Sequence, residues 1–483
     1  MAHTASPDRA ETDARREIRR RLVVVAAVFV VVLLSLDLRV RAVRDTVVDT
    51  PLRADAGQYF VYAYNLRHHG VYSRDRSAYF DPRVSPEPDA FRSPGYPLFI
   101  AAFVDGKDPG PIVHRIKAAQ VVLSVLVILL IYSTARRFLS TGAALLVALL
   151  TGLSPHLINA NVYVLSESLF AFCLALLVWV FARYVDSGRL WILFLVGILI
   201  GVGALVRPSL QYFVVPMILL IGYHAGDGRR LKAAGLIVLG FVLAFSPWVI
   251  RNVQTLDMAS DQALAIATLH HGAYPGFKYR DDDRSFGFPY RADPNGEAIA
   301  ESMDSVLAEI RRRFTEEPGR HLRWYLLGKP VMLWSWDIVQ GMGDAFVYPV
   351  KESPYFLDGF MGRSHWLMRF LHWPLVVLAA LAAIVVWLPA SVHRLEHRAR
   401  FVAQGISLLC VYFTALHMVG APFPRYTVPL RPMLYAMAGL GLVLLYRYLA
   451  ALYRARGATG RDRSRSLENR QGQSFESSSP LNR

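Results

Sequence analysis

The sequence predicts an all-α polytopic membrane protein with about ten transmembrane helices and two large extracytoplasmic loops. The chain has 483 residues, and 54% of them are hydrophobic. They fall into repeated apolar runs, many of them long enough to approach the thickness of a bilayer. The gaps between runs are rich in arginine, which marks the cytoplasmic side of membrane helices. Length, apolar runs and arginine-rich gaps together favour this class over a soluble protein.

The formal charge of +16 has a topological interpretation. In a soluble protein it would suggest nucleic acid as a partner. Here the arginines cluster at the ends of apolar runs, so we expect contacts with lipid headgroups and no nucleic acid. The two cysteines, Cys173 and Cys410, both lie inside apolar runs. They predict no disulfide framework, and no metal-ligand spacing is present.

The chain divides into two tails and one transmembrane domain. Residues 1–21 are polar and end in consecutive arginines, which predicts a cytoplasmic tail. The run at 22–36 has no small-residue cleavage site and is interpreted as a signal anchor. Residues 22–450 form the predicted domain, and the Ser/Arg/Gln-rich residues 451–483 predict a disordered cytoplasmic tail. Further helices are expected to begin near Val113, Gly142, Val162, Leu190, Leu210, Ala233, Leu367, Phe401 and Leu430.

The positive-inside rule gives a consistent orientation. With a cytoplasmic N-terminus, each predicted inside segment is basic: Arg136-Arg137, Arg183 with Arg189, Arg229-Arg230-Lys232, residues 393–400 and the C-terminal tail. We therefore expect a multi-pass protein of the plasma (inner) membrane with both termini in the cytoplasm. The large outer loops are residues 39–111 and 251–366. Within the second, residues 324–336 are too short to span and predict an interfacial or re-entrant segment.

The first outer loop contains an acid and an arginine in a distinctive context. Asp55 stands at the head of an amphipathic helical pattern, and Tyr59 and Tyr62 follow on the same face. Arg92 lies in FRSPGYPLF, where two prolines and a glycine predict a turn. Tyr96 belongs to the same motif. The three tyrosines are candidates for packing against a substrate.

More polar residues collect near the outer ends of the predicted helices. Glu167 is expected about six residues into the helix that begins near Val162, where a carboxylate needs a cavity or a partner. Guanidinium groups suit bidentate phosphate binding. The other polar residues predicted near this face are four arginines, Arg207, Arg251, Arg425 and Arg431, and one histidine, His156.

Each of these residues also has a structural interpretation. Asp55 fits a helix N-cap, Glu167 fits an interfacial acid paired with an arginine, and each arginine fits a snorkelling anchor. As a set, the arginines fit that last interpretation less well, because arginines on the outer side oppose the positive-inside bias.

The ordered motifs resemble those of the GT-C glycosyltransferases. They are DAGQYFVYAYNL, RSPGYPLFIA, LSESLFAFCLAL, GALVRPS, SPWVIRN and PRYTVPLRPML, and they span roughly residues 22–450. The branch they resemble is the family-39-like group of protein O-mannosyltransferases, the aminoarabinose lipid A transferase and polyprenyl-phosphate-sugar-dependent core transferases. The mannosyltransferases often carry an Asp-Glu pair where this chain has Asp55-Ala56.

This resemblance implies an inverting transfer of a monosaccharide from a polyprenyl-phosphate donor on the outer face of the membrane. Asp55 and Glu167 are the implied catalytic acids, and Asp55 would take the proton of the acceptor hydroxyl. Arg92, Arg207, Arg251 and Arg425 would bind the donor phosphate, and Tyr59, Tyr62, Tyr96 and His156 would line the substrate. The acceptor is an envelope glycan, lipid or protein. No cofactor is expected, although a metal stays open.

Other functions fit parts of the pattern. Charges within the membrane also suit a secondary transporter or a flippase of a lipid-linked or small anionic substrate, but transporters usually show matched halves and no convincing repeat is present here. An oligosaccharide ligase would keep the fold and change the donor. A non-catalytic scaffold would tolerate Asp55→Asn and Arg92→Ala.

Overall fold

The computed structural model describes residues 7–81 and 83–476 and is built almost entirely of helices. Within these residues, seven helical segments are long and apolar enough to cross a membrane. Six are helices α1 (Pro7–Asp45), α5 (Pro109–Ala135), α8 (Glu167–Ser187), α11 (Arg230–Leu256), α17 (Phe360–Val385) and α19 (His397–Val419). The seventh covers Pro424–Arg454 and comprises the 3₁₀ turn η8 (Pro424–Leu430) and the start of α20 (Arg431–Glu476).

Each of the ten predicted runs forms a helix, but three helices are shorter than a bilayer requires. They are α6 (Thr141–Leu153), α9 (Trp191–Val206) and α10 (Val214–His224). Between α9 and α10 lies the 3₁₀ turn η1 (Pro208–Phe213), which begins with a proline and breaks the run. The all-α polytopic class is confirmed, and of the ten predicted helices seven are long and apolar enough to span among the described residues.

The described parts of both tails continue the adjoining helices. Helix α1 begins at Pro7 and α20 ends at Glu476, while residues 1–6 and 477–483 lie outside the described residues. Extending an existing helix avoids the cost of a new nucleus. An ion pair one turn apart, between Arg21 and Glu17 at 3.0 Å, supports the extension of α1.

The segment between α1 and α5 and the segment between α11 and α17 carry the remaining elements. The first holds β1 (Val47–Val48), α2 (Ala54–His69), α3 (Ser77–Phe80) and α4 (Gly95–Ala101). The second holds α12 (Ala263–Gly272), α13 (Gly296–Ile299), α14 (Met303–Glu316), α15 (Pro318–Arg323), α16 (Lys329–Leu333) and β2 (Val350–Glu352). Short helices α7 (Pro155–Asn159) and α18 (Ala390–His393) complete the described helices.

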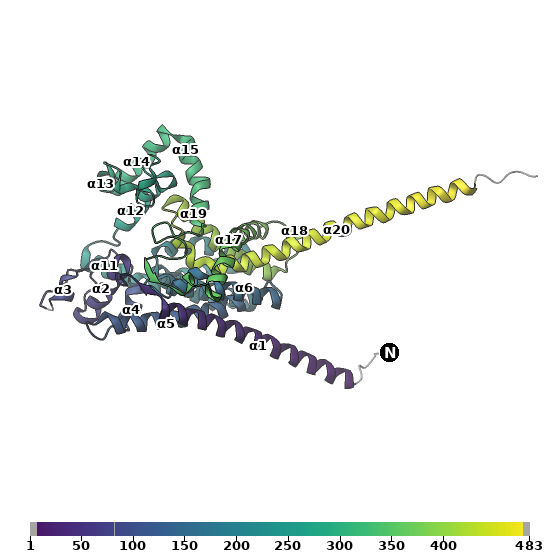
Figure 1. Cartoon of the computed structure of the whole chain (residues 1–483), viewed down its shortest axis with the longest axis horizontal. Helices are drawn as coiled ribbons and strands as arrows, with labels where there is room; N and C mark the ends of the chain where they lie inside the picture. Colours follow the sequence, from purple (N-terminus) through teal and green to yellow (C-terminus); the bar gives the residue numbers. More distant parts are fainter. Residues whose placement is uncertain (1–6, 82, 477–483) are drawn as a thin grey trace, which may run out of the picture.

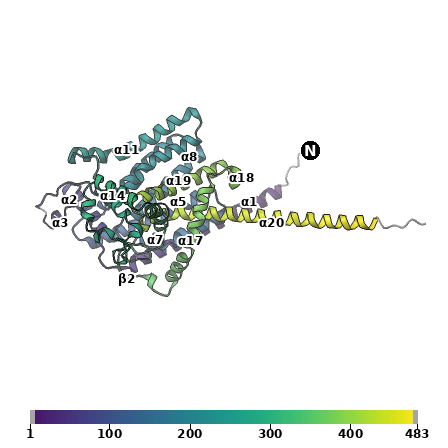
Figure 2. The ribbon, with the colours of Figure 1, turned by 90° about the horizontal axis from the view of Figure 1, so that it is seen from above.

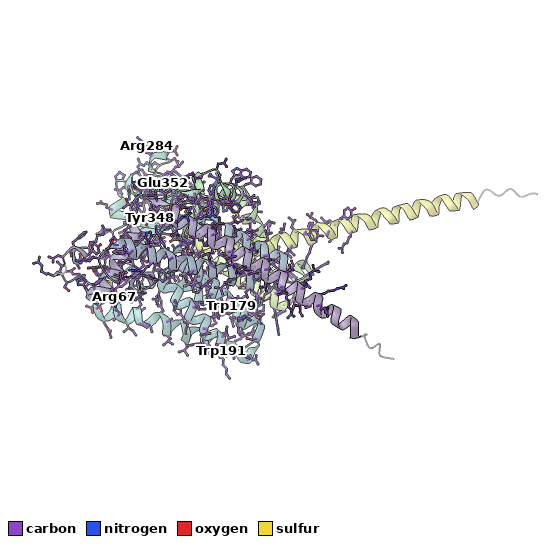
Figure 3. All side chains as sticks on the ribbon, turned by 60° about the horizontal axis from the view of Figure 1, so that its bottom comes forward. Arg67, Trp179, Trp191, Arg284, Tyr348 and Glu352 are labelled. Atoms are coloured by element: carbon purple, nitrogen blue, oxygen red, sulfur yellow. The ribbon has the colours of Figure 1, made fainter. Side chains whose placement is uncertain are left out.

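Both segments lie at the same end of the molecule. Strand β1 pairs antiparallel with β2, with Val47 opposite Glu352. Figures 1 and 2 show α1 and α20 projecting together from the opposite end. In Figure 3, Arg67, Arg284, Tyr348 and Glu352 lie toward the end away from these projecting helices. The predicted placement of the two large segments on one side therefore agrees with the fold.

Close helix packing forms the core of the bundle. Helices α9 and α11 approach through glycine: a Cβ on Gly240 would lie 2.1 Å from the carbonyl oxygen of Phe194. Small residues permit such contact between membrane helices, where dispersion forces do much of the work. A second apolar cluster joins α1, α2, α4 and α5 to residues 346–361. The core thus binds the outer segments to the bundle.

Candidate active site

Five charged residues from distant parts of the sequence meet at the end of the bundle that carries the two large segments. Asp55 lies in the first turn of α2, and Arg92 lies in the turn before α4. Glu167 is the first residue of α8, Arg207 follows the end of α9, and Arg425 lies in η8. All five are residues that the sequence marked as candidates. We call them the charged cluster.

Two arginines bind the two oxygens of Asp55. Arg92 Nη2 lies 2.6 Å from Asp55 Oδ1, and Arg425 Nη1 lies 2.9 Å from Oδ2. The carboxylate side chain keeps 29% of its surface exposed. Asp55 is therefore ion-paired and still reachable from outside the protein.

Glu167 is bound from two sides and is deeply buried. Its Oε1 accepts from Arg425 Nε and lies 2.6 Å from Arg207 Nη2. Only 2% of the side chain is exposed, and Oε2 has no hydrogen-bond partner among the described residues. Arg425 thus bridges the two carboxylates, one through Nη1 and the other through Nε.

Neutral residues that the sequence analysis did not select complete the cluster. Gln58 Oε1 accepts from Arg92 Nε at 2.8 Å and from its Nη2 at 2.7 Å. Ser166 Oγ accepts from Arg207 Nε at 2.9 Å. Their sequence neighbours are the signal that could have found them: Gln58 lies three residues after Asp55, on the same helix face, and Ser166 precedes Glu167.

A close backbone contact holds Arg92 near Arg207. Gly95 opens α4 against the end of α9, and a Cβ there would lie 2.7 Å from the backbone of Leu205 and Val206. Only glycine fits this approach without displacing the backbone. The RSPGYP motif therefore packs the turn after Arg92 against Val206, the residue before Arg207.

The position of Glu167 corrects one prediction. It does not lie six residues into its helix but begins α8, because residues 160–166 form turns. Asn161 Nδ2 donates to the carbonyl oxygens of Leu157 at 2.8 Å and Ile158 at 3.1 Å. Such side-chain bonds compete with helix formation. Glu167 consequently lies at the helix end, among the arginines.

Opposing effects set the protonation of Asp55. Burial alone would raise the pKa of this carboxyl, but the charges of Arg425 and Arg92 outweigh burial and hold the pKa below its ordinary value. Burial likewise works to lower the pKa of Arg92, and Tyr59 with Asp55 raises it overall. Without substrate, Asp55 is an ionised carboxylate.

Arg251, predicted to bind a donor, lies outside the charged cluster. Its guanidinium donates to the carbonyl oxygens of Asp89 at 2.9 Å and Tyr72 at 3.2 Å, and it stacks on Trp248 with 5.2 Å to the ring centre. It ties the end of α11 to the loop before Arg92.

The three tyrosines and the histidine predicted to line the substrate are all buried. Tyr59 lies under the Arg92 guanidinium at 5.3 Å and contacts Tyr96 edge-on. The hydroxyl of Tyr96 donates to Gln120 at 2.7 Å, and that of Tyr62 donates to Asp89. His156 is 2% exposed and contacts the carbonyl oxygen of Trp336 at 2.8 Å, in a separate layer.

The described residues contain no group of three or more His, Cys, Asp or Glu side chains arranged to hold a metal ion. In the charged cluster, guanidinium groups occupy both oxygens of Asp55 and one oxygen of Glu167. The arrangement instead offers several donors for an anionic oxygen ligand.

Comparison with solved structures finds similarity at low sequence identity. One is the oligosaccharyltransferase AglB of Archaeoglobus fulgidus with an inhibitory peptide and a dolichol-phosphate, at 14% identity and a TM-score of 0.48. Another is the same enzyme in the apo form, at 15% identity and 0.48. Each match covers 90% of this chain and 52% of the other, so the chain spans about half their length. Among curated proteins, none matches significantly.

A family model gives the more specific match. Residues 112–250, from α5 to near the end of α11, match the dolichyl-phosphate-mannose-protein mannosyltransferase family. This stretch contains Glu167 and Arg207 of the charged cluster. The resemblance predicted from the ordered motifs is thereby confirmed: over these helices the chain is similar to membrane glycosyltransferases of the GT-C type.

Proposed function

We propose that the protein transfers a monosaccharide from a polyprenyl-phosphate donor to an acceptor hydroxyl on the outer face of the membrane, with inversion. The observation that carries this proposal is the charged cluster: a partly exposed carboxylate, Asp55, pairs with two guanidinium groups, and the buried Glu167 holds a third beside them. A sugar transfer from a lipid phosphate needs a base for the acceptor and cations for the departing phosphate.

The charge of the cluster favours a phosphate monoester leaving group over a pyrophosphate. Three guanidiniums and two carboxylates leave a single net positive charge. A polyprenyl phosphate sugar is a phosphodiester with one negative charge, which this excess balances. A pyrophosphate-linked glycan carries two. The match supports the monosaccharide donor over the donor of an oligosaccharide ligase.

In the proposed step, Asp55 accepts the proton of the acceptor hydroxyl. The acceptor oxygen forms a bond to the anomeric carbon from the face opposite the phosphate. The bond between that carbon and the phosphate oxygen breaks, and its electron pair stays on the phosphate. The phosphate gains the negative charge that Asp55 loses, and the guanidiniums stabilise it where it develops.

Exposure separates the roles of the two acids. Asp55 is 29% exposed and can meet a hydroxyl, whereas Glu167 is 2% exposed. Glu167 instead orients Arg207 and Arg425 through its buried oxygen. We therefore assign proton transfer to Asp55 and the positioning of two donor-binding arginines to Glu167.

Donor binding also activates the base in this scheme. In the free protein, Arg92 and Arg425 are both ion-paired with Asp55. A bound phosphate would compete for these guanidiniums, and every contact it takes weakens the ion pairs that depress the pKa of Asp55. The carboxylate thus becomes a stronger base when the donor is present.

The proposed outer location rests on charge asymmetry. Helix α2, which carries Asp55, and α4, which follows Arg92, lie at the end of the bundle opposite the projecting α1 and α20 (Figure 1). Basic residues lie between the helices on the side of these projections, including Arg136, Arg137 and Arg229. By the positive-inside rule this side is cytoplasmic, so the cluster faces outward.

The test is transfer of radiolabel from purified polyprenyl-phosphate monosaccharides to an envelope extract. Asp55→Asn removes the base and keeps the size of the side chain, so we expect turnover to fall by about 10²- to 10⁴-fold. Asp81→Asn is the matched control, because Asp81 lies in the same segment and pairs with the exposed Arg83. It should keep the wild-type rate.

Wild-type turnover in a folded Asp55→Asn protein would remove Asp55 as the base. Transfer from pyrophosphate-linked oligosaccharides alone would favour the ligase. Movement of an intact lipid-linked sugar across liposomes, without a new glycosidic bond, would favour a flippase.

A further inference from the structure

A continuous helical rod runs down beside membrane helix α19. It comprises α15 (Pro318–Arg323), a π-helical turn (Trp324–Gly328) and α16 (Lys329–Leu333). Figure 1 shows α15 above α19. π-helical turns inside helices often accompany functional sites. The rod makes no part of the charged cluster.

Two side-chain contacts fix the depth of the rod. Lys329 Nζ donates to the carbonyl oxygens of Val419 at 3.2 Å and Gly420 at 2.9 Å, where α19 ends. Five residues later, Trp334 Nε1 donates to Thr414 Oγ1 at 3.0 Å, five residues back along α19. The rod therefore descends antiparallel to α19, which is long and apolar enough to span. Arg323 precedes Lys329 by six residues and so lies above its level on the rod.

The rod presents an exposed apolar face. Leu326, Leu327 and Val331 are 58%, 64% and 57% exposed. Leu327 and Val331 border a groove of about 560 Å³. Its lining is mostly apolar, comprising Phe286, Trp324, Leu327, Gly328, Val331, Met332 and Val339 with the polar Arg323, Ser335 and Asp337.

Arg323 supplies a positive charge at the upper part of this groove. Nearby arginines are committed to carboxylates: Arg313 pairs with Glu309 at 2.6 Å and Arg320 pairs with Asp281 at 2.8 Å. Arg323 has no carboxylate partner among the described residues, and it lines the groove. Its guanidinium is thus free to bind an anion.

We propose that this groove binds one anionic phospholipid of the surrounding bilayer, with the headgroup phosphate on Arg323 and an acyl chain along Leu327 and Val331. The charge lies above the end of α19 and the apolar surface lies beside it, as in a lipid at a membrane interface. No residue of the charged cluster lines the groove. The occupant is therefore a bulk lipid that seats α12–α15 on the membrane, not the reacting donor.

Native mass spectrometry of the delipidated full chain tests the site. The probes are phosphatidylglycerol and phosphatidylcholine with identical acyl chains. We expect wild type to prefer phosphatidylglycerol roughly fivefold, the value of one basic residue near a membrane surface. Arg323→Ala should abolish this preference. Leu327→Ser with Val331→Ser should weaken binding of both lipids.

Arg311→Ala is the control, since Arg311 is an exposed arginine of α14 outside the groove. It should keep the wild-type preference. Equal preference in wild type and Arg323→Ala would overturn the site. Polyprenyl phosphate that binds wild type more tightly than phosphatidylglycerol does, and loses this advantage in Arg323→Ala, would assign the groove to the donor and overturn the bulk-lipid assignment.

Discussion

At the residue scale, the chemistry depends on how arginines are shared between two carboxylates. Asp55 holds Arg92 and Arg425, and Glu167 holds Arg207 and the same Arg425. Removal of one cation changes both the affinity for a phosphate and the basicity of Asp55. The two effects are separable, because a change in the basicity of Asp55 shifts the pH dependence of the reaction, whereas a change in phosphate affinity does not.

Replacement of Arg92 tests this coupling. The active form of Asp55 is the carboxylate, so activity falls as pH falls through its pKa. Arg92→Gln removes one of the two charges that lower this pKa. We expect the acidic limb of kcat/KM to move upward by about one pH unit. The measurement is label transfer between pH 3 and 7, with Arg83→Gln as the control. A lower rate with an unmoved limb would contradict the coupling.

The sequence predicted the charged members of the site better than the neutral ones. A carboxylate or guanidinium near a membrane is costly, so its presence alone marks Asp55, Arg92 and Arg425. Gln58 carries no such cost and could not be selected. Arg251 and His156 were predicted because they lie near outer helix ends, but depth does not tell which way a side chain points around the helix.

At the element scale, the segment from α12 to α14 holds histidines that stay neutral in the fold. His271 is 6% exposed, and its Nε2 donates to the carbonyl oxygen of Gly287 at 2.9 Å. Burial lowers the pKa of His271 to about 4. Burial also lowers the pKa of His270. Protonating either residue favours the unfolded segment.

This segment should therefore weaken in mild acid. Between pH 6.5 and 4 the unfolded state binds more protons than the folded state, so stability falls as pH falls. For His271 we expect a loss of about 2 kcal/mol between pH 7 and 5. Hydrogen exchange of residues 263–323 measures it, after correction for intrinsic rates. His271→Gln should flatten most of the dependence. Unchanged protection of wild type at pH 5 would refute this account.

The apolar runs predicted where helices occur but not their lengths. Every run formed a helix, since hydrophobic composition decides that much. The short α6, α9 and α10 depend on local breaks, such as the proline that opens η1, and on partners distant in the sequence. The re-entrant or interfacial segment at 324–336 was predicted from its length and tryptophans, and the rod beside α19 agrees with it.

At the scale of the whole molecule, the two large segments form one body. The β1–β2 pair joins them, and beside it the backbone N–H of Asp49 donates to the carbonyl oxygen of Pro349 at 3.0 Å. Figure 3 shows Tyr348 and Glu352 at the end that carries Arg67. Apolar runs could not predict this pairing, because two- and three-residue strands leave no periodic signal.

A cysteine pair tests that connection. Val47 and Glu352 lie opposite each other in the antiparallel β1–β2 pair, and both are exposed. Paired strand residues lie within the Cα distance that a disulfide spans. We expect Val47→Cys with Glu352→Cys to cross-link under mild oxidation, as a linked peptide in mass spectrometry, with the transfer rate retained. Val47→Cys with Asp358→Cys is the control. Failure of the first pair to cross-link would contradict the contact between the two segments.

The bridging position of Arg425 has a consequence for biosynthesis. Asp55, Arg92, Glu167 and Arg207 all emerge from the ribosome and enter the membrane before it. Until Arg425 arrives, Glu167 has one cation instead of two and the carboxylates are not connected. A nascent chain therefore holds most of the site in an unfinished form. Insertion of the segment Pro424–Arg454 brings Arg425 into contact with both acids. A chain that stops before this segment has four of the five charged residues but lacks the link between the two carboxylates.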